Sequence, residues 1–218
     1  MIEIHCTKKL LARLPVDEQG NLPVSKTHGA LPTVPGQLSP LSGWHANLLT
    51  IQRRNCVMFV HDTTRFPLFI ASLKKPDFAN LEYWFEDALI NTLMKCGATD
   101  LQLNKAGHAL QRLKMDSQTD RSVQGTLNRM GQDADYYLDY DGLNVEEILG
   151  YGLAARLAHG PCMIKGRKDA LWPEREFLAL LDTLPEPGEV PNPRTVPPTL
   201  PENVTSLVDF RARKNGSH

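Results

Sequence analysis

Apolar residues recur at every third or fourth position from Asp120 to Leu138, and this spacing predicts a helix with one buried face. The apolar positions are Val123, Leu127, Met130, Ala134 and Leu138. Asp120 or Ser122 is suited to cap the first turn. Arg121 and Asn128 then fall on or beside the polar face, where packing does not require them. Two interpretations of this pair are open: a binding site, or an ordinary solvated helix face.

Alternating apolar residues predict a strand over Ile2–Cys6, followed by a short helix that Thr7 caps. Three further strands are predicted at Ala46–Gln52, Cys56–His61 and Phe66–Ser72. Because only short turns separate these three, we expect an antiparallel meander.

The second half of the chain has mainly helical patterns. Helices are predicted within Pro76–Cys96, from Asn144 to His159 behind a capping box with Glu147, and from Pro173 to Leu184. Residues 101–115 indicate a helix followed by a strand. We therefore expect a single α+β domain over residues 1–184, with a mostly antiparallel sheet and helices chiefly on one face.

Two stretches lack periodicity. Residues 16–42, rich in proline and glycine, predict a long surface loop. Residues 185–201 contain seven prolines and predict an extended linker. Residues 202–218 then form either a docking peptide for a partner or a solubilising basic tail, and the candidate contacts there are Leu207, Phe210, Arg211, Arg213 and Lys214.

Three motifs stand in order along the chain: CTKKLL at 6–11, GWHANLL at 43–49 and RSVQGTLN at 121–128. Together they resemble an uncharacterised family of small bacterial proteins, over roughly residues 1–184. The family has no assigned activity. Its members often lie beside plasmid- and transposon-borne genes, which implies an accessory role on mobile genetic elements. The chain departs from the family pattern at His61-Asp62 and at Arg129, where an acidic residue is usual.

Composition narrows the functional classes. With 218 residues, 41% of them hydrophobic, the chain can bury one good core. Its net charge of −1 provides no overall field that attracts nucleic acid or anionic lipid, so such binding requires a local patch. No apolar run reaches the roughly 18 residues of a membrane span, and no apolar signal core opens the chain. We expect a soluble cytoplasmic protein with no membrane partner.

No residue pattern predicts a metal, a cofactor or a catalytic set. The four cysteines are far apart and lack metal-ligand spacing, so we expect buried thiols in a reducing compartment. His61-Asp62 is similar to the metal-binding pair of phosphohydrolases, but the further ligands are absent. Patterns typical of P-loop, Rossmann, zincin and serine-hydrolase sites do not occur.

Basic residues at predicted turns and element ends suggest a cationic rim that would suit a phosphate backbone. Its candidate members are Lys8, Lys9, Arg53, Arg54, Lys74, Lys75 and Arg121, with Trp44 and His45 nearby. The alternative is a set of dispersed surface charges.

Two functional classes remain open. The first is a non-enzymatic adaptor that binds a protein or nucleic-acid partner through the domain and the C-terminal peptide. The second is a small enzyme acting on nucleic acid or nucleotides, with a pocket around Arg121, Asn128, His61 and Asp62. The absence of a recognisable catalytic set favours the adaptor.

Overall fold

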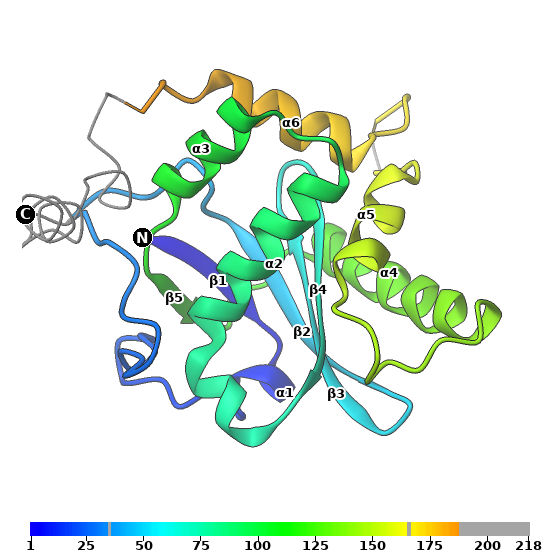
Figure 1. Ribbon diagram of the computed structural model, residues 1–218, viewed down its shortest axis with the longest axis horizontal. Helices are drawn as coiled ribbons and strands as arrows, with labels where there is room; N and C mark the ends of the chain where they lie inside the picture. The colour runs from blue at the N-terminus through cyan, green and yellow to red at the C-terminus, as the bar shows by residue number, and fades with distance from the viewer. Residues whose placement is uncertain (35, 165–166, 188–218) are drawn as a thin grey trace, which may run out of the picture. The chain divides into compact units, whose positions relative to one another are not determined.

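A computed structural model describes residues 1–34, 36–164 and 167–187. Five strands in these residues form one sheet of order β4-β3-β2-β1-β5 (Figure 1). The α+β class is confirmed, and the sheet is mixed: β2, β3 and β4 form the predicted antiparallel meander, whereas β1 is parallel to both β2 and β5. The strands are β1 (Ile2–Cys6), β2 (Trp44–Ile51), β3 (Arg54–His61), β4 (Pro67–Leu73) and β5 (Leu113–Asp116).

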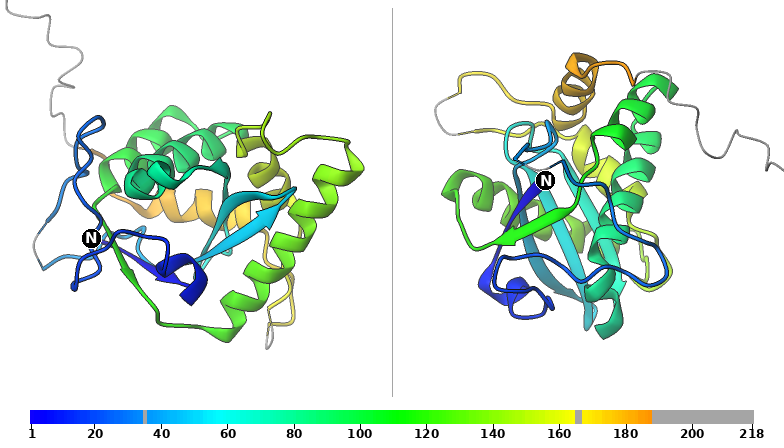
Figure 2. Two further views of the ribbon diagram at one scale, coloured as in Figure 1. Left: turned by 90° about the horizontal axis from the view of Figure 1, so that it is seen from below. Right: turned by 90° about the vertical axis from the view of Figure 1, so that its left-hand side faces the viewer.

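Helices cover the two faces of the sheet unequally. One face carries α2, α3 and α6, and the other carries α4, as the two views of Figure 2 show. A short α1 follows β1, and α5 packs against α2, β4, α4 and α6. The helices are α1 (Lys8–Leu11), α2 (Leu81–Lys95, after a 3-10 turn at Lys75–Asn80), α3 (Asp100–Ala109), α4 (Arg121–Tyr140), α5 (Tyr151–His159) and α6 (Pro173–Thr183).

Side-chain alternation along the strands divides the core between the two faces. The larger part includes Trp44, Phe85 and Phe177, all fully buried. The smaller part lies under α4 and includes Met58 and Met130. Because α4 packs chiefly on β2 and β3, it leaves the same face of β1 and β5 to polar side chains.

The long loop predicted over residues 16–42 is tied to the edge strand. Asn21 forms an isolated bridge with Lys114 of β5. Arg112, just before β5, donates from its side chain to the Leu22 carbonyl and from its backbone N–H to the Pro32 carbonyl. The loop thereby covers the open edge of the sheet, which limits pairing with another chain.

The helix predicted from Asn144 begins only at Tyr151, and that prediction is wrong for its first two turns. Asn144 Oδ1 accepts from the Glu146 N–H at 3.0 Å and stabilises a turn. Gly150 then adopts a φ of 87°, with its backbone so close to β4 that a Cβ would lie 2.3 Å from the Phe69 carbonyl oxygen. The left-handed backbone of Gly150 interrupts the helix, and the close approach to β4 requires glycine at this position.

All four cysteines are buried and free, as predicted. None of the helices in residues 1–34, 36–164 and 167–187 combines the length and hydrophobicity needed to cross a membrane. Most of the predicted linker and the whole predicted tail, residues 188–218, lie outside the described residues.

Candidate functional site

Two histidines and two aspartates form a connected cluster on the face of the sheet that α4 covers only in part. His5 Nδ1 lies 2.7 Å from Asp116 Oδ1, and His45 Nδ1 lies 2.7 Å from Asp62 Oδ1. The other oxygen of Asp62 is 3.7 Å from His5 Nε2 and joins the two pairs. Strand register brings them together, because His5 is paired with both His45 and Asp116 on the neighbouring strands.

The start of α4 holds His45 in one tautomer. The Asp120 N–H donates to His45 Nε2 at 2.8 Å. Nε2 therefore carries no proton, and Nδ1–H donates to Asp62. With both nitrogens bonded and only 2% of its surface exposed, His45 anchors α4 to β2 and offers no atom to a ligand.

His5 is arranged differently, because only its Nδ1 is hydrogen-bonded among the described residues. Asp116 orients the ring, and Nε2 faces Asp62. The side chains of His5, Asp62 and Asp116 are 13%, 28% and 29% exposed, so solvent reaches the edge of the cluster. A carboxylate behind one imidazole nitrogen, with the other nitrogen open, is an arrangement capable of general acid–base chemistry.

A groove of about 560 Å³ runs along the exposed side of α4. The motif at 121–128 has its apolar Val123 and Leu127 in the core, and four of its other residues line the groove. The lining consists of Arg121, Ser122, Gly125, Thr126, Arg129 and Met163.

Gly125 lies in the helix with no packing reason for a glycine. Nothing lies within 4 Å of the position that a Cβ would take, beyond the backbone of its own helix. A glycine in a helix interior costs about 1 kcal/mol relative to alanine. Bare backbone at this point lets a ligand or a partner chain approach the helix closely.

A buried guanidinium lies behind the groove. Arg65 is 6% exposed, donates to Ser122 Oγ at 3.2 Å and also donates to the Asp62 carbonyl. Its Nε is buried with no hydrogen-bond partner among the described residues, and burial lowers the pKa of Arg65. Because Ser122 Oγ accepts from Arg65, the Ser122 O–H is free to donate into the groove.

His61 and Asp62 point in different directions. The His61 ring packs in the core, with centroids 4.9 Å from Trp44 and 5.3 Å from Phe177. Burial lowers the pKa of His61 to about 4. Asp62 instead joins the polar cluster on the other face. The structure therefore does not bring together the four residues considered for an enzyme pocket, Arg121, Asn128, His61 and Asp62.

The cations considered for one rim lie at two ends of the sheet. Lys9 Nζ is 3.4 Å from Thr50 Oγ1, near the turn that contains Arg53. Arg121 lies at the other end of β2, next to the residue that bonds His45. The length of β2 separates the two groups by about 20 Å.

The other described residues predicted to bind a partner lie on α1, on β2 and β3, and on α4. Lys8 is exposed on α1, and Arg54 forms a 2.8 Å ion pair with Glu146. Trp44 and His45 are 0% and 2% exposed, so neither offers a contact surface. Asn128 is exposed on α4 but outside the groove lining. The C-terminal candidates lie outside the described residues: Leu207, Phe210, Arg211, Arg213 and Lys214.

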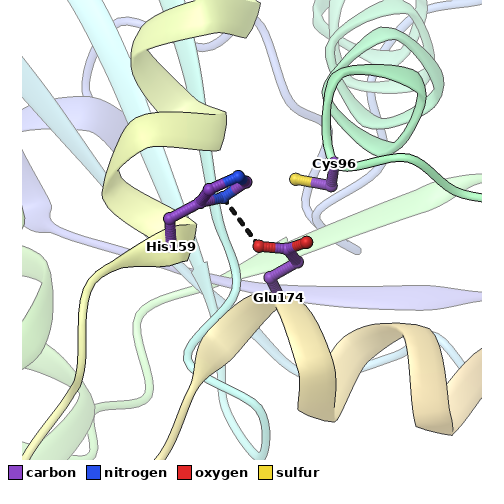
Figure 3. Close-up of side chains that lie close together, drawn as sticks. All are labelled: Cys96, His159 and Glu174. Carbon is purple, nitrogen blue, oxygen red and sulfur yellow. Dashed lines mark ion pairs between the residues drawn. The ribbon is translucent and has the colours of Figure 1, made fainter.

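Three potential metal ligands meet where three helices end or begin (Figure 3). Cys96 caps the C-terminus of α2, His159 ends α5, and Glu174 lies in the first turn of α6. One ligand atom from each lies within 4.8 Å of the others, and His159 Nδ1 is 2.7 Å from Glu174 Oε2. Burial, and then the charge of Glu174, raises the pKa of Cys96 to about 12.

Neither His5 and Asp116 nor the set of Cys96, His159 and Glu174 was predicted from the sequence. One signal for His5 was present, since it alternates with the buried Ile4 and Cys6 and therefore lies on the other face of a central strand. For the other residues the sequence spacing carries no signal, because they meet only in the folded chain.

No curated protein and no solved structure is a significant match to this chain. The profile of a domain of unknown function, DUF6933, matches residues 3–176. This range includes the His/Asp cluster, the α4 groove and the three potential metal ligands. The chain therefore belongs to the family defined by the domain of unknown function DUF6933.

Proposed function

We propose that this protein is a non-enzymatic adaptor that binds an acidic segment of a partner protein in the groove along α4. The observation that supports this most is the chemistry of the lining. Arg121 and Arg129 flank a bare stretch of helix at Gly125, and the described lining contains no carboxylate.

Both arginines are available to a partner. Arg121 is exposed and has no ion pair or hydrogen bond among the described residues. Arg129 has one contact with a carboxylate, Asp133 at 3.6 Å, and such exposed pairs contribute little. Guanidinium groups bind carboxylates with two parallel hydrogen bonds. Eight helical residues rise about 12 Å, which fits two acidic residues about four positions apart in an extended peptide.

A peptide fits this groove better than nucleic acid does. Met163, 66% exposed, adds an adaptable apolar contact to the lining. The described lining has no aromatic ring on which a base could stack. The net charge of −1 also provides no general attraction for a polyanion.

The test is affinity capture from the native host, with nuclease-treated and untreated lysates. We expect the wild type to retain a protein partner in both lysates and Arg121→Glu/Arg129→Glu to lose it. Lys8→Glu/Lys9→Glu is the matched control, because it makes the same change of charge on α1. Gly125→Met should also lose the partner, since it fills the groove without changing charge. Retention by both groove variants, or a partner that disappears with nuclease, would contradict the proposal.

A second candidate, an enzyme acting on nucleotides or nucleic acid, is favoured by one observation. His5 is oriented by Asp116 and keeps Nε2 open toward Asp62. Hydrolysis of nucleoside triphosphates and of a phosphodiester model substrate should then depend on His5 and be lost in His5→Gln. His108→Gln, at an exposed histidine of α3, should retain it. If the wild type hydrolyses neither, this candidate is eliminated.

A further inference from the structure

We propose that Cys96, His159 and Glu174 form a binding site for one zinc ion. Zinc in proteins is held by cysteine sulfur, histidine nitrogen and carboxylate oxygen, and this cluster supplies one of each. Figure 3 shows the three side chains directed toward one another from three separate segments. The inference is independent of the α4 groove, because it uses none of the groove residues.

The distances require only a small adjustment. Tetrahedral zinc with ordinary bond lengths places its ligand atoms roughly 3.3 to 3.7 Å apart. The ligand atoms here lie within 4.8 Å of one another, and His159 Nδ1 and Glu174 Oε2 are 2.7 Å apart. The side chains of His159 and Glu174 are 55% and 22% exposed and have room to separate around an ion.

The surroundings favour a cation. Cys96 and His159 stand at the C-termini of α2 and α5, where helix dipoles place partial negative charge. Glu174 adds a full negative charge, which exceeds the partial positive charge of the α6 N-terminus where it lies. Zinc binds the Cys96 thiolate, and the displaced thiol proton leaves to solvent. Without the ion, the desolvated Cys96 thiol lies beside the Glu174 carboxylate. With the ion, the Cys96 sulfur and a Glu174 oxygen are both bonded to the zinc.

Three protein ligands leave the fourth position of the ion open to water or to a ligand. The ligands come from α2, α5 and α6, which pack against one another through α5. A bound ion therefore joins three helix ends, and we expect it to raise the midpoint of thermal unfolding, because it binds only the folded chain.

The competing interpretation is a His159–Glu174 ion pair next to an unrelated buried thiol. Cobalt distinguishes the two, because Co²⁺ bound to a thiolate gives a charge-transfer band in the near ultraviolet. We expect the chelator-treated full-length protein to develop this band up to one equivalent of Co²⁺ and to lose it when Zn²⁺ is added. Cys96→Ser should abolish the band. His159→Ala and Glu174→Gln should weaken binding by at least about tenfold.

Two matched controls accompany these variants. Glu176→Gln changes a carboxylate on the same helix, and His108→Ala changes an exposed histidine at the end of α3; both should bind Co²⁺ as the wild type does. If Cys96→Ser does not fold, His159→Ala still tests the proposal, because that side chain is half exposed. Absence of one-to-one binding, a spectrum without the thiolate band, or an unchanged band in the folded variants would overturn it.

Discussion

His45 and His61 lie on opposite faces of the sheet, and polar groups surround the first whereas aromatic rings surround the second. His45 has both nitrogens bonded, to Asp62 and to the Asp120 N–H. His61 lies among aromatic rings and bonds Thr64 Oγ1 through Nδ1 at 2.9 Å. A charge on His61 would therefore be poorly solvated, which is the main reason that its pKa is lowered to about 4.

Stability should accordingly fall when the pH decreases from 7 to 5. The pKa of His61 is about 4 in the folded chain and 6.5 when unfolded, so the unfolded state takes up the proton first. The stabilisation that comes from the neutral His61 is present above pH 6.5 and is lost progressively down to about pH 4. The loss between pH 7 and pH 5 amounts to about 2 kcal/mol. Urea denaturation of wild type and His61→Phe at both pH values measures it.

The His61→Phe variant should show the smaller loss over this range, whereas His108→Gln, at an exposed position, should follow the wild type. An equal loss in all three proteins would mean that His61 is not the group responsible.

At the scale of elements, α4 serves the core and a surface at once. Its apolar positions pack under the sheet, and Asp120 caps it by accepting from the Ser122 and Val123 N–H groups at 2.7 and 3.0 Å. These bonds also lower the pKa of Asp120, so the cap stays charged. The cap satisfies two N–H groups of the first turn and thereby stabilises the end of α4 that lines the groove.

The entry to α5 depends on one glycine, and we predict that Gly150→Ala is severely destabilising. The new Cβ would lie 2.3 Å from the Phe69 carbonyl oxygen, at a φ of 87° that favours glycine. Gly142→Ala is the matched control: it also has positive φ, 63°, but no atom within 4 Å of the Cβ position. We expect the free energy of unfolding, measured by chemical denaturation, to fall by about 1 kcal/mol in Gly142→Ala and by at least about 3 kcal/mol in Gly150→Ala. If both variants lost a similar free energy of unfolding, the close approach of Gly150 to β4 would not be the cause of the loss.

At the scale of the whole molecule, the described core reaches from Ile2 to Leu184. Both parts of the core use the same sheet, so the two faces should unfold together. The last members are Phe177, Leu181 and Leu184 of the α6 region, packed on the larger part of the core.

Truncation after Pro187 should therefore leave thermal stability nearly unchanged. We expect the midpoint of unfolding to stay within about 5 °C of the full chain, since a larger shift in a domain of this size implies more than about 1 kcal/mol. A control truncation before α6, after Trp172, removes Phe177 and Leu181 and should unfold the domain. A marked decrease in the midpoint of unfolding of the variant that ends at Pro187 would show that residues beyond 187 belong to the fold.

Local pattern was sufficient for most elements. The three-and-four spacing of α4 and the Pro173 start of α6 depend on neighbours within a few residues, and the sequence predicted both. For the cap of α4 the sequence left Asp120 and Ser122 open, and the structure has Asp120. The meander was predictable for the same reason, because short turns leave adjacent strands few alternatives. The helix expected from Asn144 failed where a contact with distant Phe69 overrode local propensity.

The sequence by itself therefore determined the α+β class, the amphipathic helices and the burial of the cysteines, because these follow from short-range periodicity and hydrophobicity. Only the tertiary structure decided which polar residues meet. His5 reaches Asp116 because β1 lies between two parallel neighbours, and Cys96 reaches His159 and Glu174 because three helix ends converge. Such contacts join residues 63 to 111 positions apart, and no local pattern encodes them.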